Sequence, residues 1–174
     1  KFGGTGTKRY LIQKDDDTTK IGSPVLEELP EVDMGDWNEL VKFVKWGMEK
    51  YPAEHYLVTI WNHGSGWDKY KRESVKGVSY DDTSNSHIKA QDLTLAFSEI
   101  KKINNGQNVD LVGFDACLMG VAEIMEQLYG YVDYVVSSEE VEPWDGWPYN
   151  DVLEPLVQNP KMSPIEFGKI DVDK

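Results

Sequence analysis

Two short segments carry the side chains best suited to nucleophilic chemistry. His63 lies in Asn62-His63-Gly64-Ser65-Gly66-Trp67, and the one cysteine, Cys117, lies in Asp115-Ala116-Cys117-Leu118-Met119-Gly120. A thiolate attacks carbonyl carbon, and a nearby histidine can carry protons to the leaving amine and from the attacking water. Taken singly, each residue more often has a structural role, because free cysteines are commonly buried and histidines commonly lie in loops or cores.

A hydrophobic run precedes each segment. Tyr56 to Trp61 is apolar, β-branched and aromatic, which predicts a strand buried on both faces of a parallel sheet, and Val109 to Phe114 predicts another strand. Ligands bind beyond the carboxyl ends of such strands, so both reactive residues are expected at one sheet edge. Val121 to Leu128 predicts a helix after the cysteine, and a position at its N-terminus would lower the pKa of the Cys117 thiol.

The rest of the chain alternates strand and helix patterns. Further strands are expected at 9–13, 77–80 and 131–137, and further helices at about 36–51, 93–103, 150–158 and 163–170. Glycine and prolines at 22, 24 and 30 indicate a loop, a polar turn is expected through Ser86, and residues 68 to 76 are expected to form an exposed loop. The alternation predicts an α/β three-layer sandwich with a mainly parallel central sheet and helices on both faces.

Length and charge restrict the function classes. The chain has 174 residues, which suits one domain, and no apolar run approaches the roughly 18 residues of a membrane-spanning helix. A net charge of -13 repels phosphate, which argues against a nucleic-acid partner. The charge either serves solubility or attracts cationic substrates. One cysteine excludes an internal disulfide framework and leaves the compartment open.

The two hexapeptides together resemble the paired signature of the clostripain family of cysteine peptidases, whose wider relatives are caspases, legumains and gingipains. The resemblance covers about residues 8 to 158. It implies a caspase-like fold and endopeptidase cleavage after Arg or Lys, without a required third catalytic side chain. By this resemblance His63 and Cys117 form the catalytic dyad, and the backbone amides of Gly64 and Cys117 form the oxyanion hole.

Asp115 lies two residues before Cys117, on the same face of an extended strand. Its carboxylate is expected to line the pocket for the residue before the scissile bond and to pair with lysine or arginine, or alternatively to cap the following helix. Asp145 is either a second acid of that pocket or a solvated turn residue. Trp144 and Trp147 either form pocket walls or pack their loop onto the domain.

Several family members mature by self-cleavage between the histidine and the cysteine. The loop 68–77 offers Lys69, Lys71, Arg72 and Lys76, and the bond after Lys76 is preferred because it precedes an apparent strand. Alternatively, these basic residues only solvate the loop.

Family domains usually have one more strand and helix ahead of residues 9–13 and continue past the equivalent of Lys174. The chain is therefore expected to be a single caspase-like peptidase domain, 1–174, that lacks its first strand and C-terminal part. The resemblance also implies a secreted or cell-envelope bacterial protein that requires no cofactor. Calcium responsiveness occurs in the family, but no ligand cluster here is specific enough to name a calcium site.

The expected partners are peptides or proteins with basic residues, and the oligomeric state is left open. One rival interpretation is a catalytically silent peptidase-like domain that binds peptides or partners. Another is a metal-dependent hydrolase with His63, Asp115 and Cys117 as ligands, although no close second histidine or cysteine supports that set.

Overall fold

The structure, a computed structural model, describes residues 6–14, 17, 19–67 and 76–173. The chain divides into two compact units, residues 1–33 and 34–174, and each is described by itself. Within the described ranges no helix combines the length and apolar character needed to cross a membrane.

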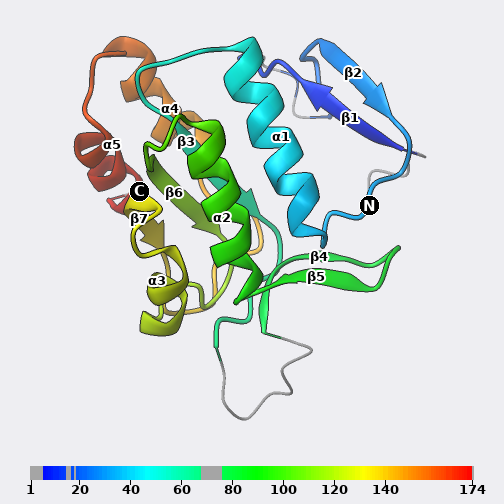
Figure 1. Cartoon of the computed structure of the whole chain (residues 1–174). Coiled ribbons are helices and arrows are strands. Elements are labelled where there is room, and N and C mark those ends of the chain that lie inside the picture. Colours follow the sequence, from blue (N-terminus) through cyan, green and yellow to red (C-terminus); the bar gives the residue numbers. More distant parts are fainter. Residues whose placement is uncertain (1–5, 15–16, 18, 68–75, 174) are drawn as a thin grey trace. The chain divides into compact units, whose positions relative to one another are not determined.

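The first unit contains an antiparallel ribbon (Figure 1). Strand β1 (Thr7–Tyr10) pairs with β2 (Val25–Leu29). Ion pairs join Arg9 to Glu27 and Lys8 to Glu28 across the ribbon. The prediction of a loop marked by Gly22, Pro24 and Pro30 is thus partly wrong, because Val25–Leu29 of this segment form β2. Cross-strand pairs stabilise this short charged strand, although its sequence shows no clear alternation of apolar and polar residues.

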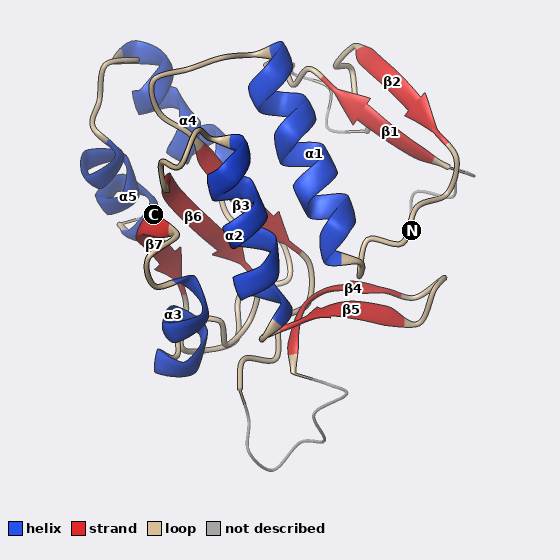
Figure 2. Cartoon of the chain, in the orientation of Figure 1, coloured by secondary structure: helices blue, strands red, loops and turns tan. Residues whose placement is uncertain are grey.

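The second unit is built around a parallel sheet with the strand order β3-β6-β7 (Figure 2). Its strands are β3 (Leu57–Trp61), β6 (Val109–Asp115) and β7 (Val132–Ser137), close to their predicted positions. Trp61 is opposite Asp115 in the parallel register of β3 and β6. Both segments that carry the reactive residues therefore leave the sheet at the same edge.

Helices cover both faces of this sheet. On one face, Val112 and Phe114 of β6 share a buried cluster with side chains of α1 (Trp37–Lys50), α2 (Asp92–Ile103) and α3 (Ala122–Leu128). On the other face, Leu111 packs with side chains of α4 (Tyr149–Gln158) and α5 (Pro164–Val172). The predicted α/β architecture with helices on both faces is confirmed.

Strand β3 differs from its prediction. Val58 and Ile60 are buried, but Trp61 is 61% exposed and Leu57 is 37% exposed. The second core cluster draws its strand residues from β6 and β7, so α4 and α5 cover those strands and leave one face of β3 less covered. The prediction that this strand is buried on both faces was therefore wrong.

A separate hairpin lies between β3 and α2 in the chain. It pairs β4 (Gly77–Asp81) with β5 (Ser86–Lys89) in antiparallel fashion. Asp81 organises the turn by accepting the N–H groups of Thr83 and Ser84 at 2.8 and 2.9 Å. The polar turn was thus predicted, but the strand after it was missed.

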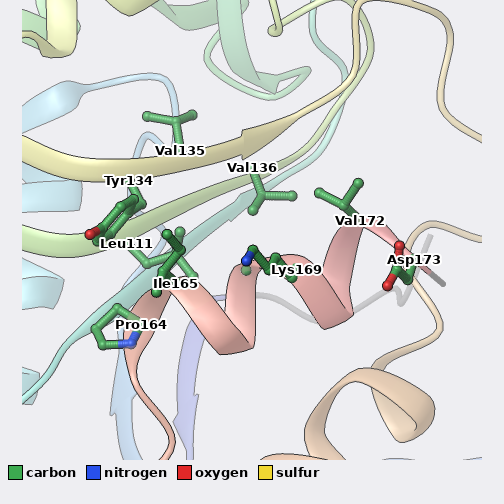
Figure 3. A pocket seen from close by; sticks show the side chains of 10 residues that line it. Leu111, Tyr134, Val135, Val136, Pro164, Ile165, Lys169, Val172 and Asp173 are labelled. Atoms are coloured by element: carbon green, nitrogen blue, oxygen red, sulfur yellow. The ribbon is translucent and has the colours of Figure 1, made fainter.

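Helix α5 packs along β6 and β7. Gly168 lies against Val136 and Leu111, which allows this close approach. Side chains of one helix stripe, including Ile165 and Val172, line a groove beside β7 (Figure 3). Phe167 and Asp171, four residues apart and therefore on another common face of α5, are only 4% and 9% exposed.

Candidate active site

Cys117 lies in a turn directly after β6. The strand ends at Asp115, and α3 begins only at Ala122. The predicted position of Cys117 at a helix N-terminus was therefore wrong, and the helix dipole gives no argument for an activated thiol. The thiol is free and its residue is partly exposed.

The turn after Cys117 is sharp, and hydrogen bonds to the segment that follows β7 hold it in place. Leu118 has φ 63°, a left-handed conformation that costs a non-glycine residue roughly 1 kcal/mol. Two hydrogen bonds offset this cost: Leu118 N–H donates to the Glu140 carbonyl at 3.0 Å, and Gly120 N–H donates to the Ser138 carbonyl at 2.7 Å. The chain that follows β7 thus fixes the position of the cysteine.

His63 lies in the loop that follows β3. Asn62 N–H donates to the Asp115 carbonyl at 3.3 Å, and the Asn62 side chain accepts the His63 N–H at 2.6 Å. The exposed imidazole lies near two aromatic rings, with centroid distances of 6.4 Å to Tyr80 and 6.3 Å to Trp144. It is accessible from solvent, as proton transfer to a substrate requires.

Gly64 brings the two segments together. A Cβ atom built on Gly64 would overlap the Cys117 carbonyl oxygen and would lie 3.1 Å from the Cys117 nitrogen. A Cβ atom built on Gly66, whose φ is +54°, would likewise overlap the Leu118 carbonyl oxygen. The backbone next to His63 is therefore in van der Waals contact with the backbone of Cys117, which places both predicted dyad members in one small region.

Ser65 anchors the histidine loop to the β4–β5 hairpin. Ser65 N–H donates to the Gly77 carbonyl at 3.0 Å, and Gly77 N–H donates to Ser65 Oγ at 3.1 Å. Ser65 Oγ also hydrogen-bonds the Tyr80 hydroxyl at 2.7 Å, and the Tyr80 ring stacks on His87 at 4.7 Å. Sequence reasoning missed Tyr80, because this contact depends on hairpin pairing and has no local pattern.

Asp115 is 2% exposed and is held by the loop before α4. Its Oδ2 accepts the backbone N–H of Trp147 at 3.2 Å and the hydroxyl of Tyr149 at 2.8 Å. Helix α3 has no side-chain N-cap, so the alternative that Asp115 caps the following helix is wrong. The carboxylate instead faces the α4 and α5 side of the sheet, because Asp115 shares its strand face with Leu111 and Gly113.

The tryptophan-rich loop divides its side chains between the sheet and solvent. The Trp147 ring lies over Gly113, where a Cβ atom would approach it to 2.7 Å. Trp144 is 90% exposed and lies near His63, and Asp145 is also exposed. Trp147 therefore packs the loop onto the sheet, whereas the Trp144 ring lies beside His63.

Two further acids lie close to Asp115. Burial, followed by the charge of Asp115, raises the pKa of Glu142, whose carboxylate also accepts a hydrogen bond from the Trp147 side chain. Burial, followed by the charges of Asp115 and Glu142, raises the pKa of Asp171 to about 6. Burial and the hydrogen bond to Asp115 likewise raise the pKa of Tyr149.

The sequence analysis did not single out these residues as neighbours of Asp115. The available signals were weak: Glu142 belongs to a visibly acidic loop, and Asp171 follows Phe167 at helical spacing. Neither pattern shows that α5 lies beside the end of β6.

Lys76 is only 9% exposed, and its ammonium lies 5.0 Å above the Trp67 ring. Its carbonyl accepts the Ala90 N–H at 3.2 Å. The other basic residues of the predicted cleavage loop, Lys69, Lys71 and Arg72, lie outside the described residues.

Within the ranges that the structure describes, no group of three or more histidine, cysteine, aspartate or glutamate side chains is arranged to hold a metal ion. His63, Asp115 and Cys117 are among the residues covered, so the rival metal-ligand set is not assembled here.

Comparison with known proteins identifies relatives of the chain. A family model described as the Clostripain family matches residues 3–174. Clostripain of Hathewaya histolytica is 33% identical over 131 residues, which cover 71% of this chain and 25% of that protein. The chain thus spans about a quarter of the length of this curated relative.

Solved structures show a similar fold. A secreted C11 cysteine protease from Bacteroides thetaiotaomicron, solved with an irreversible peptide inhibitor, is 26% identical with a TM-score of 0.69, covering 97% of this chain and 45% of that one. An inactive zymogen C11 protease from Parabacteroides distasonis has a TM-score of 0.58 at 20% identity, covering 87% of this chain and 40% of that one. The second likeness concerns the fold alone.

Proposed function

Because the chain belongs to the clostripain family, we propose that it is a cysteine endopeptidase that cleaves peptide bonds after arginine or lysine. Cys117 is the nucleophile, and His63 is the general base and acid. The observation that carries this proposal is the close contact of Gly64 with the Cys117 backbone, which joins the two reactive segments.

The chemistry follows from these positions. His63 accepts the thiol proton, and the Cys117 sulfur attacks the scissile carbonyl carbon while its oxygen becomes an oxyanion. The N–H groups of Gly64 and Cys117 stabilise that oxyanion. The carbon–nitrogen bond breaks as His63 gives its proton to the leaving amine, and water then hydrolyses the thioester and restores the thiol.

Preference for basic residues is supported by the charge around Asp115. None of the ion pairs among the described residues includes Asp115, Glu142 or Asp171. A pocket with uncompensated carboxylates favours a cationic side chain. The net charge of -13 adds a long-range attraction for basic peptides.

Asp115→Asn tests this preference. With fluorogenic peptides ending in Arg, Lys, Asp or Leu, the wild type is expected to cleave only the basic ones. The variant should lose about 10- to 100-fold in kcat/KM on them, since one charge-assisted contact is removed. Asparagine still accepts hydrogen bonds from Trp147 and Tyr149, so the fold should persist.

Asp133→Asn is the matched control for this experiment. It makes the same change on an exposed residue of β7 and should leave the kinetics unchanged. Equal cleavage of leucyl and arginyl peptides by the wild type would contradict the proposed specificity.

We further propose that the protein cleaves itself after Lys76. Cleavage requires the hydrogen bonds of the Lys76 carbonyl and the Gly77 amide to open, because a peptidase binds its substrate as free extended chain. Incubated wild type should yield a fragment that begins at Gly77, and Lys76→Ala should not. N-terminal sequencing checks this result, with Lys89→Ala, in the paired strand, as the control.

Cys117→Ala must also lack this fragment if the cleavage is autocatalytic. A fragment that instead begins after residue 69, 71 or 72 would show that the cleaved bond was misassigned.

A further inference from the structure

Asp171 is an unusual residue of α5. It is 9% exposed, and neither of its carboxylate oxygens, both of which are buried, has a hydrogen-bond partner among the described residues. Burying an unpaired carboxylate opposes folding, so Asp171 in its ionised form adds nothing to the stability of the domain. Its position therefore calls for an explanation outside the packing of α5.

The neighbours of Asp171 are acidic or neutral. Asp115 from β6 and Glu142 from the loop before α4 are close enough for their charges to disfavour ionisation of Asp171, and Tyr149 of α4 interacts with it. The strand face of Asp115 and the buried face of α5 thus converge on one acidic cluster. Within the described chain no basic side chain forms an ion pair with it.

We propose that Asp171 binds the guanidinium group of a substrate arginine at the position before the scissile bond, and that it thereby makes the pocket prefer arginine to lysine. The proposal rests on the function proposed above. It adds a substrate-binding residue, Asp171, and a preference for arginine over lysine.

The carboxylate oxygens that remain available to accept hydrogen bonds favour a guanidinium group over an ammonium group. Asp115 Oδ2 already accepts two hydrogen bonds, whereas both oxygens of Asp171 are unused. A planar guanidinium donates to both oxygens of one carboxylate at once, which a lysine ammonium does less well. Because these oxygens are buried, the groups that cover them must move when the arginine enters.

Steady-state kinetics with matched arginyl and lysyl peptides test the proposal. Asp171→Asn is expected to lower kcat/KM about 10- to 100-fold for the arginyl peptide, mainly through KM, and by less than about threefold for the lysyl peptide. Asp173→Asn, the same change on the exposed residue that directly follows α5, should behave as wild type. An unchanged arginine-to-lysine ratio in Asp171→Asn would overturn the proposal.

A binding measurement separates this inference from the proposed activity. Arginine amide is expected to raise the melting temperature of Cys117→Ala, and the rise should vanish in the Cys117→Ala, Asp171→Asn double variant. If the wild type cleaves neither peptide, the proposed function fails, while this assay still decides the inference. A rise of equal size in both proteins, or in neither, contradicts a guanidinium site at Asp171.

The pH dependence of stability tests whether Asp171 has a merely structural role. Since the folded-state pKa of Asp171 is raised from 3.8 to about 6 by burial, Asp115 and Glu142, the contribution of Asp171 to stability becomes less favourable as pH rises through that interval. Asp171→Asn removes this loss, so its melting temperature should exceed that of wild type above pH 6 and converge with it near pH 4. A lower melting temperature above pH 6 would show that Asp171 is a stabilising residue and would contradict the proposal.

Discussion

Cys117→Ala is expected to abolish hydrolysis of arginyl and lysyl peptides, with a fall in kcat of at least about 1,000-fold. Alanine removes the nucleophile but leaves the turn, which is held by backbone hydrogen bonds of Leu118 and Gly120. Fluorogenic peptide assays at saturating substrate measure the loss. His63→Ala should cause a comparable fall, and the double variant should be little worse than either single variant, because the two residues act as a unit.

His55→Ala is the matched control for the histidine. His55 is exposed and pairs with Asp110 at 2.6 Å, near the opposite end of the sheet from His63. This variant should keep wild-type kcat. Full activity in Cys117→Ala would refute the thiol mechanism, and full activity in His63→Ala would assign the proton transfers to another group.

Gly64→Ala is expected to reduce kcat by about 100-fold or more, because it disturbs both the dyad and the proposed oxyanion hole. The added methyl group would overlap the Cys117 carbonyl oxygen, which is backbone and cannot swing aside. The two segments must then separate, so KM for the same peptides should change less than kcat. Kinetics combined with circular dichroism and thermal melting measure the effect.

Gly47→Ala is the control for this substitution. Gly47 lies inside α1 with no atom within 4 Å of an added Cβ, so alanine should leave activity unchanged and stabilise the helix by up to about 1 kcal/mol. Wild-type kcat in Gly64→Ala would mean that the contact with Cys117 has no role in catalysis. A cooperative melt near that of wild type would assign a loss of activity to the site and not to unfolding.

Some elements of the fold were predictable from the sequence, and others were not. Strand β6 is a run of buried residues, and α2 repeats apolar residues at helical spacing, so local patterns located both. Strands β2 and β5 are short and partly polar, and partners distant in sequence hold them in place. Local periodicity carries no information about such pairing.

The sequence by itself determined which residues are candidates for the chemistry. His63 and Cys117 were predicted as a catalytic pair from short motifs, and the strands before them predicted that both lie at one sheet edge, because the carboxyl ends of parallel strands meet there.

Only the tertiary structure decided what surrounds that chemistry. It set Gly64 against the cysteine backbone and brought Asp171 of α5 to the acidic face of β6. The physical reason is that local sequence contains both the type of the candidate nucleophile and the strand at whose carboxyl end it lies. Burial, the unpaired state of a carboxylate and contacts between distant segments arise only when the helices pack on the sheet.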